Sequence, residues 1–288
     1  MLKVVLHAVA IGSFKMVGIA GTLIWWCLAY EVVRADVPAA PAGARYRGGL
    51  RNSPDQRKLS TGQLKEVLQS LRAKTGWHEL YFDHEGFLLC PAPNKFTGGS
   101  AAARRLLGAA LNATQAFDME AHSYSSNVVF AQLAPAVEYR SRRTGEQISA
   151  FPVQVDFADF QQLRGDEEAR KAFDLGLVIL HELGHAVWSL RDAEANGEPG
   201  ECETYINRIR RELNLPERQA YFAKARAGTL NPSTGIRQIA ELVFVRAGTK
   251  PGKQPRQEQF LLRWEAESVG KFLPVLPPGR ASLTASFR

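Results

Sequence analysis

A short motif in the second half of the chain has the residue types and spacing to hold a metal ion. It reads His181-Glu182-Leu183-Gly184-His185, the H-E-x-x-H pattern, inside the apolar run VILHELGHAVW. Residues four apart lie on one face of a helix, so both imidazoles can bind one tetrahedral Zn²⁺, and Glu182, turned by about 100°, can reach a water on that ion. The alternative is a core helix that buries two histidines and a carboxylate without partners, which costs several kcal/mol.

A catalytic zinc site needs a third protein ligand, and the sequence offers several. A third histidine at the spacing H-E-x-x-H-x-x-G-x-x-H is excluded, because Trp188 and Arg191 occupy the later positions. Glu203 is the favoured ligand, since Asn207 and Arg210 share its face of the next predicted helix and can support it. The alternatives are Glu201, which points to another side of that helix, and then Glu194, Glu198 and His122.

Residues 172–221 resemble a known enzyme family. HELGH followed 18 residues after its second histidine by a helical Glu looks like the zincin metallopeptidases of the Glu-ligand type, the gluzincins. The following E-x-x-x-N-R-I-R-R-E-L-N-L-P-E-R-Q-A-Y is similar to the same segment in effector-type bacterial metallopeptidases. The resemblance implies a zincin-like fold and peptide hydrolysis, with Glu182 as the base for a zinc-bound water. The oxyanion that forms also needs a donor, for which Tyr205, Tyr221 and Arg210 are candidates.

Other polar residues near the motif have competing interpretations. Asp156 and Asp159 precede the motif helix and can support a ligand histidine, but turn or cap roles are favoured. Cys202 can bind metal or oxidise, but an ordinary half-buried thiol or a partner for Cys90 is favoured. The runs 127–133 and 151–157 can bind an extended peptide at a sheet edge, but a role as core strands is favoured.

The order of predicted elements indicates an α+β fold, with a small mixed sheet packed on a long motif helix and a second core helix. Apolar spacing predicts a first helix within 59–76, and Ser100 is the expected N-cap of the next. A hairpin is predicted around His84-Glu85-Gly86, and further strands within 127–157. One helix of more than 20 residues is expected over 167–190, and another over 201–213. The run 216–228 is amphipathic, and 236–248 fits either helix or strand.

The N-terminal 35 residues predict export. Residues 4–33 are almost wholly apolar, and their densest stretch is MVGIAGTLIWWCLAY, which is short for a membrane span. A cleaved signal peptide is favoured slightly over an uncleaved anchor, and a buried core helix is the third alternative. Residues 36–55 are predicted as a linker, 56–247 as the metallopeptidase domain and 248–288 as a basic tail. The protein is then periplasmic, secreted or membrane-anchored, with its catalytic domain outside the cytosol.

Composition narrows the function classes further. The 288 residues carry a net charge of +7, much of it in residues 246–288, where no nucleic-acid-binding motif accompanies the basic residues. Three cysteines exclude a disulfide framework.

The leading hypothesis is an exported zinc peptidase with a peptide or protein substrate, no specific nucleic-acid partner, and a membrane contact through an uncleaved N-terminus. The alternatives are a zinc hydrolase of a non-peptide envelope amide and a membrane-tethered binding module with a non-catalytic zinc.

Overall fold

The computed structural model describes residues 48–125, 128–140, 147–194, 197–231, 235–247, 257–269 and 284–285. These residues form a mixed structure of helices and sheets, which confirms the α+β prediction. The segment predicted as a signal peptide or anchor lies outside the described residues. Within those residues, no helix has the length and apolarity that crossing a membrane requires.

The first sheet is mixed, as predicted, and its middle strands are parallel. Its strand order is β1-β4-β7-β5, with β6 also paired to β7. The parallel strands are β1 (Gly49–Asn52), β4 (Ala116–Ala121) and β7 (Gln147–Val155), and the strands antiparallel to β7 are β5 (Ala131–Leu133) and β6 (Val137–Arg140). Strand β1 lies inside 36–55, so the chain is already part of the fold at Gly49–Asn52, where a linker was predicted; residues 36–47 of that linker lie outside the described residues. A short hairpin of β2 (Tyr81–Phe82) and β3 (Leu88–Leu89) turns at Gly86, as predicted.

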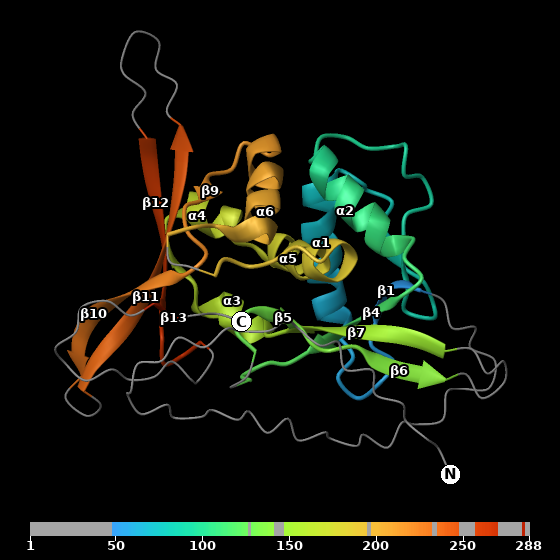
Figure 1. Ribbon diagram of the computed structural model, residues 1–288, viewed down its shortest axis with the longest axis horizontal. Helices are drawn as coiled ribbons and strands as arrows, with labels where there is room; N and C mark the ends of the chain where they lie inside the picture. The colour runs from blue at the N-terminus through green and yellow to red at the C-terminus, as the bar shows by residue number, and fades with distance from the viewer. Residues whose placement is uncertain are drawn as a thin grey trace, which may run out of the picture. The chain divides into compact units, whose positions relative to one another are not determined.

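Four helices pack against one another beside this sheet (Figure 1). They are α1 (Thr61–Thr75), α2 (Ala101–Leu111), α5 (Leu175–Trp188) and α6 (Gly200–Glu212). Local signals set their starts: Ser60 and Gln63 form a capping box before α1, and the Ser100 hydroxyl accepts from Ala103 N before α2. Helix α5 carries the H-E-x-x-H motif and is buried from Gly176 to Gly184, which places the motif in the core.

The prediction of one long helix over 167–190 was wrong, because the helix is interrupted at Phe173. Helix α4 (Glu167–Ala172) ends there, where the backbone leaves helical dihedrals with φ −131° and ψ 56°. Asp174 then begins α5: its carboxylate accepts from Leu177 N at 3.0 Å and pairs with Lys74 Nζ at 2.7 Å. The N-cap stabilises a new helix start where the apolar pattern continues without interruption.

A second sheet was not predicted; it forms mainly from residues after the motif, with the short strand Arg164–Gly165 from before it. Its order is β13-β10-β11-β12-β8, with β9 paired to β11. Strand β12 pairs with β11 along its length, so this sheet continues past the predicted domain end at 247 into the segment predicted as a basic tail. Residues 248–256, 270–283 and 286–288 of that segment lie outside the described residues. The members are β8 (Arg164–Gly165), β9 (Glu217–Arg218), β10 (Ala223–Asn231), β11 (Gly235–Ala247), β12 (Gln257–Glu265) and β13 (Thr284–Ala285).

An aromatic cluster joins the second sheet to the segment before β5. The Phe130 ring lies 5.3 Å from Trp264 of β12, and 5.0 Å from Phe173 between α4 and α5, both edge-to-face. Phe160 of α3 (Phe157–Gln162) packs on the same ring at 5.4 Å. The cluster therefore connects the start of β5, a strand close to the motif helix, to the rest of the core.

Candidate metal centre

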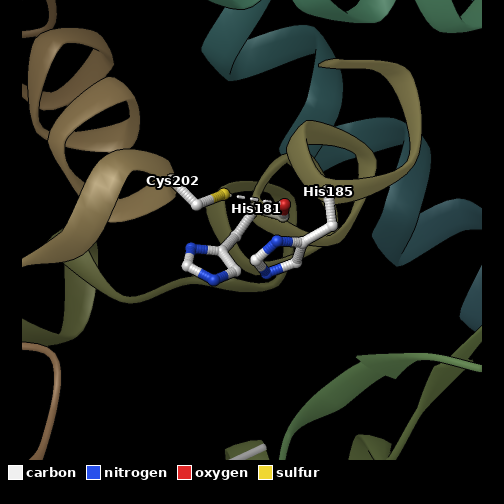
Figure 2. A group of neighbouring side chains, drawn as sticks. All are labelled: His181, His185 and Cys202. Atoms are coloured by element: carbon white, nitrogen blue, oxygen red, sulfur yellow. Dashed lines mark hydrogen bonds between the residues drawn. The ribbon is translucent and has the colours of Figure 1, made fainter. Parts of the chain in front are cut away.

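The two motif histidines lie together on α5, as predicted. Their rings are 4.8 Å apart between centroids and nearly perpendicular. Figure 2 shows both imidazoles projecting from the same side of the helix. His181 is buried and His185 is partly exposed, so one side of the pair stays accessible.

The Nδ1 atom of each imidazole faces an acceptor oxygen of the protein. His185 Nδ1 lies 2.6 Å from the Leu190 carbonyl oxygen, and His181 Nδ1 lies 3.5 Å from Glu203 Oε2. With protons on these Nδ1 atoms, the Nε2 atoms keep a lone pair for a metal ion. Both Nε2 atoms face Asp192 Oδ1, His181 at 3.0 Å and His185 at 3.4 Å.

Asp192 was missed by the sequence reasoning. It lies in the loop after α5, with its side chain 31% exposed, and its second oxygen accepts from the Tyr221 hydroxyl at 2.9 Å. Burial raises its pKa, but hydrogen bonds and charges from His181 and His185 outweigh burial and hold the pKa well below its ordinary value. The signal that could have identified it is its place as the first acid after His185.

Glu203, the predicted third ligand, lies on the Nδ1 side of His181. It is 1% exposed, with Oε1 on Arg210 Nη1 and Oε2 3.1 Å from Arg218 Nη1. Burial raises its pKa, but the two arginine charges outweigh burial and hold the pKa well below its ordinary value. The structure does not bring Glu203 to the Nε2 atoms; it places this carboxylate in a buried ion network behind His181.

The predicted oxyanion donors have separate positions. Arg210 is 2% exposed, and its guanidinium donates to Glu203, Asn207 and the Ala172 carbonyl, which places it in the buried ion network with Glu203. The Tyr205 hydroxyl donates to Ala102 O at 2.9 Å and its ring packs on Trp188, so Tyr205 joins helices instead. Tyr221 does lie at the site: its ring stacks on His181 with centroids 5.9 Å apart.

Glu182, the predicted base, contacts the edge of the first sheet. Its Oε2 accepts from Leu133 N in β5 at 2.8 Å. The side chain is 8% exposed, and burial raises the pKa of its carboxyl group. A carboxylate beside the histidine pair is therefore held in one orientation by a backbone donor.

Cys202 is the third member of a cluster of potential metal ligands with His181 and His185, whose ligand atoms lie within 4.8 Å of one another. Its thiol, however, donates to the His181 carbonyl at 3.1 Å, and burial raises its pKa. In Figure 2 the sulfur lies against the helix backbone, while the imidazoles project away from it. Cys202 and Cys90 are both free thiols.

The remaining candidates lie outside the histidine pair. Glu201 pairs with Arg191 at 3.2 Å, Glu194 and Glu198 are exposed, and His122 contacts Glu120 at 2.9 Å. Asp156 is the N-cap of α3, and Asp159 accepts from Phe130 N at 2.9 Å. These two acids serve as cap and loop support, the interpretation that the sequence favoured.

Comparisons with known proteins add nothing to this geometry. The chain matches no protein-family model, no curated protein and no solved structure. A functional argument for this chain therefore depends on the chemistry of its own residues.

Proposed function

We propose that this chain is a zinc-dependent hydrolase of peptide bonds. The observation that carries the proposal is that His181 Nε2 and His185 Nε2 both lie beside the same oxygen, Asp192 Oδ1. The Nδ1 atom of each ring faces an acceptor. Two imidazoles and an oxygen donor match the ligands that catalytic zinc prefers, so the site fits that ion. A helix carrying these ligands beside a mixed sheet also supports the zincin-like arrangement that the sequence resemblance implies.

His181 and His185 would hold the zinc, which in such sites supplies a Lewis acid and lowers the pKa of water to about 7. Glu182 acts as the general base: it takes a proton from the attacking water and delivers it to the leaving amine. The bond from Leu133 N keeps the Glu182 carboxylate in position for both transfers.

The adjoining sheet edge favours a peptide over another amide. Among the described strands, β5 pairs only with β7. Two bonds mark the side that faces β7: Asp156 N donates to Phe130 O, and Ala134 N donates to Pro152 O. Backbone groups alternate sides along a strand, so Leu133 directs its N–H outward, and that group contacts Glu182. An extended peptide along this outer edge would pass directly beside the catalytic carboxylate. It would donate its own N–H groups to the edge carbonyls, because Leu133 N and Ala131 N already donate to Glu182 and to Val129 O.

Replacing Glu182 by Gln tests the proposal. Glu182→Gln keeps an acceptor for Leu133 N but removes the base, so we expect zinc content to stay near one ion per chain while peptide cleavage falls by about 10²–10⁴-fold. Elemental analysis and turnover of a peptide library, measured on the full chain, report the two quantities. The control is Glu198→Gln, which neutralises an exposed carboxylate in the nearby loop and should leave both unchanged.

Two results would contradict the proposal. Full cleavage by Glu182→Gln would remove Glu182 from the mechanism. A wild-type chain that binds zinc but cleaves no peptide would favour a non-catalytic site or a non-peptide amide as substrate.

A further inference from the structure

The loop that follows α5 carries an acid that the sequence did not single out. We infer that Asp192 is the third protein ligand of the metal centre, and that Glu203 positions His181 without touching the ion. The inference rests on the proposed function, and it departs from the resemblance, which implies a ligand on α6.

Distances between donor atoms support Asp192. Two ligands about 2.0–2.2 Å from one tetrahedral zinc lie about 3.3–3.6 Å from each other. Asp192 Oδ1 lies 3.0 Å from His181 Nε2 and 3.4 Å from His185 Nε2, close to this spacing for both histidines at once. The same oxygen therefore completes a set of two imidazoles and one carboxylate.

Glu203 lacks a comparable place in the set. Its oxygens bind Arg210 and Arg218, and the nearest histidine atom is His181 Nδ1 at 3.5 Å, on the opposite side of the ring from Nε2. A carboxylate that accepts from Nδ1 orients the imidazole and raises its basicity toward a metal on Nε2. The two arginines offset the cost of burying that negative charge.

The backbone around Asp192 is anchored on both sides. Ser189 ends α5 in the left-handed region at φ 53°, which turns the chain back so that the Leu190 carbonyl reaches His185 Nδ1. Arg191 O accepts from Cys202 N at 3.0 Å, at the start of α6. With Tyr221 bonded to Oδ2, the carboxylate is oriented before any ion arrives, as a metal ligand requires.

Zinc affinity of the full chain, measured by competition with a chelator, tests the inference. We expect Asp192→Ala to weaken zinc binding by more than 100-fold, because even losses beyond the ligand shell cost about 10–100-fold. Tyr221→Phe keeps the ring but frees Asp192 Oδ2, and should weaken binding by about 10–100-fold. Glu203→Gln keeps an acceptor for His181 Nδ1 and should cost about tenfold or less. Glu198→Gln is the matched control, with unchanged affinity.

Two further readouts separate a ligand role from a folding role. Saturating zinc should raise the urea midpoint of wild type and of Glu203→Gln by similar amounts, because both keep the ligands, and should raise that of Asp192→Ala much less. Cobalt in place of zinc should give a spectrum without a thiolate charge-transfer band, since Cys202 is not a ligand.

Wild-type affinity in Asp192→Ala, or a thiolate band with cobalt, would overturn the inference and leave the proposed function standing. So would a loss in Glu203→Gln larger than the loss in Asp192→Ala. A wild-type chain without zinc affinity would instead defeat the proposed function itself.

Discussion

Two neighbouring acids show how strongly the surroundings control a side chain. The Asp156 carboxylate accepts from the backbone N–H groups of Ser125, Ala158 and Asp159. Asp159, three residues later and 3% exposed, accepts from Phe130 N, and burial raises its pKa from the ordinary 3.8 to about 7. Asp156 is therefore a cap whose oxygens accept from the backbone, whereas burial makes Asp159 costly to ionise.

The raised pKa of Asp159 predicts a pH-dependent stability. Between its unfolded and folded pKa values the folded state binds the extra proton, so the free energy of unfolding falls as pH rises from about 4 to 7. Asp159→Asn keeps an acceptor for Phe130 N and removes the titration. We expect the stability of Asp159→Asn relative to wild type to grow by about 2–3 kcal/mol between pH 5 and pH 8, measured by urea unfolding. A constant difference would mean that Asp159 is ionised throughout.

At the scale of elements, the packing of α5 on α6 depends on a glycine within the motif. A Cβ at Gly184 would lie 2.9 Å from the Cys202 sulfur and 3.5 Å from Leu190 Cδ1. The helices can therefore approach closely only because this position lacks a side chain. In the sequence, Gly184 fills one of the unspecified positions of H-E-x-x-H, and its role becomes visible only with α6 in place.

Adding a methyl group at this contact tests the packing. Gly184→Ala should lower the free energy of unfolding by about 1–3 kcal/mol, because the crowded sulfur belongs to a buried side chain. Adding Cys202→Ala should recover part of that loss. A double-mutant cycle by urea unfolding measures the coupling, and additive effects would show that the two positions do not meet.

For the described chain as a whole, the aromatic cluster holds distant segments together. Trp264 is 2% exposed and contacts Phe130, which immediately precedes β5. The strand on which Glu182 depends is thus supported by residues about 130 positions later in the chain.

Emptying this cluster should weaken the fold. We expect Trp264→Ala to reduce the free energy of unfolding by about 3–5 kcal/mol, and Trp264→Phe to reduce it much less, because the second variant keeps a ring against Phe130. Thermal or urea unfolding of the full chain provides the measurement. Equal effects for the two variants would argue that ring packing is not what Trp264 supplies.

Residues close in sequence were enough to predict several elements and the histidine pair. The helix within 59–76, the cap at Ser100, the hairpin at Gly86 and the shared face of His181 and His185 each depend on contacts within four or five positions. Periodicity and capping report such contacts directly, which is why these predictions were confirmed.

Long-range contacts decided the rest. Strand β4 was not predicted, because Asp118 and Glu120 interrupt its apolar pattern. In the fold both acids are buried with partners from other segments, Arg51 for Asp118 and Arg57 and Gln154 for Glu120. The sequence of β11 fits either a helix or a strand, and its pairing with β10 and β12 makes it a strand. Strand propensity depends on the neighbouring strands, so one segment alone does not reveal which distant segment it pairs with.

Tertiary structure also decided which carboxylate lies at the histidine pair. By sequence, Glu203 had the better case, because it stands on a predicted helix with supporting neighbours. The fold pairs that carboxylate with Arg210 and Arg218, and turns the chain at Ser189 so that Asp192 faces both Nε2 atoms. The sequence alone determined which residues can bind a metal on one helix. Only the path of the loop after α5 and the position of Arg218 decided which acid lies at the histidine pair, because side-chain charges pair by distance in space.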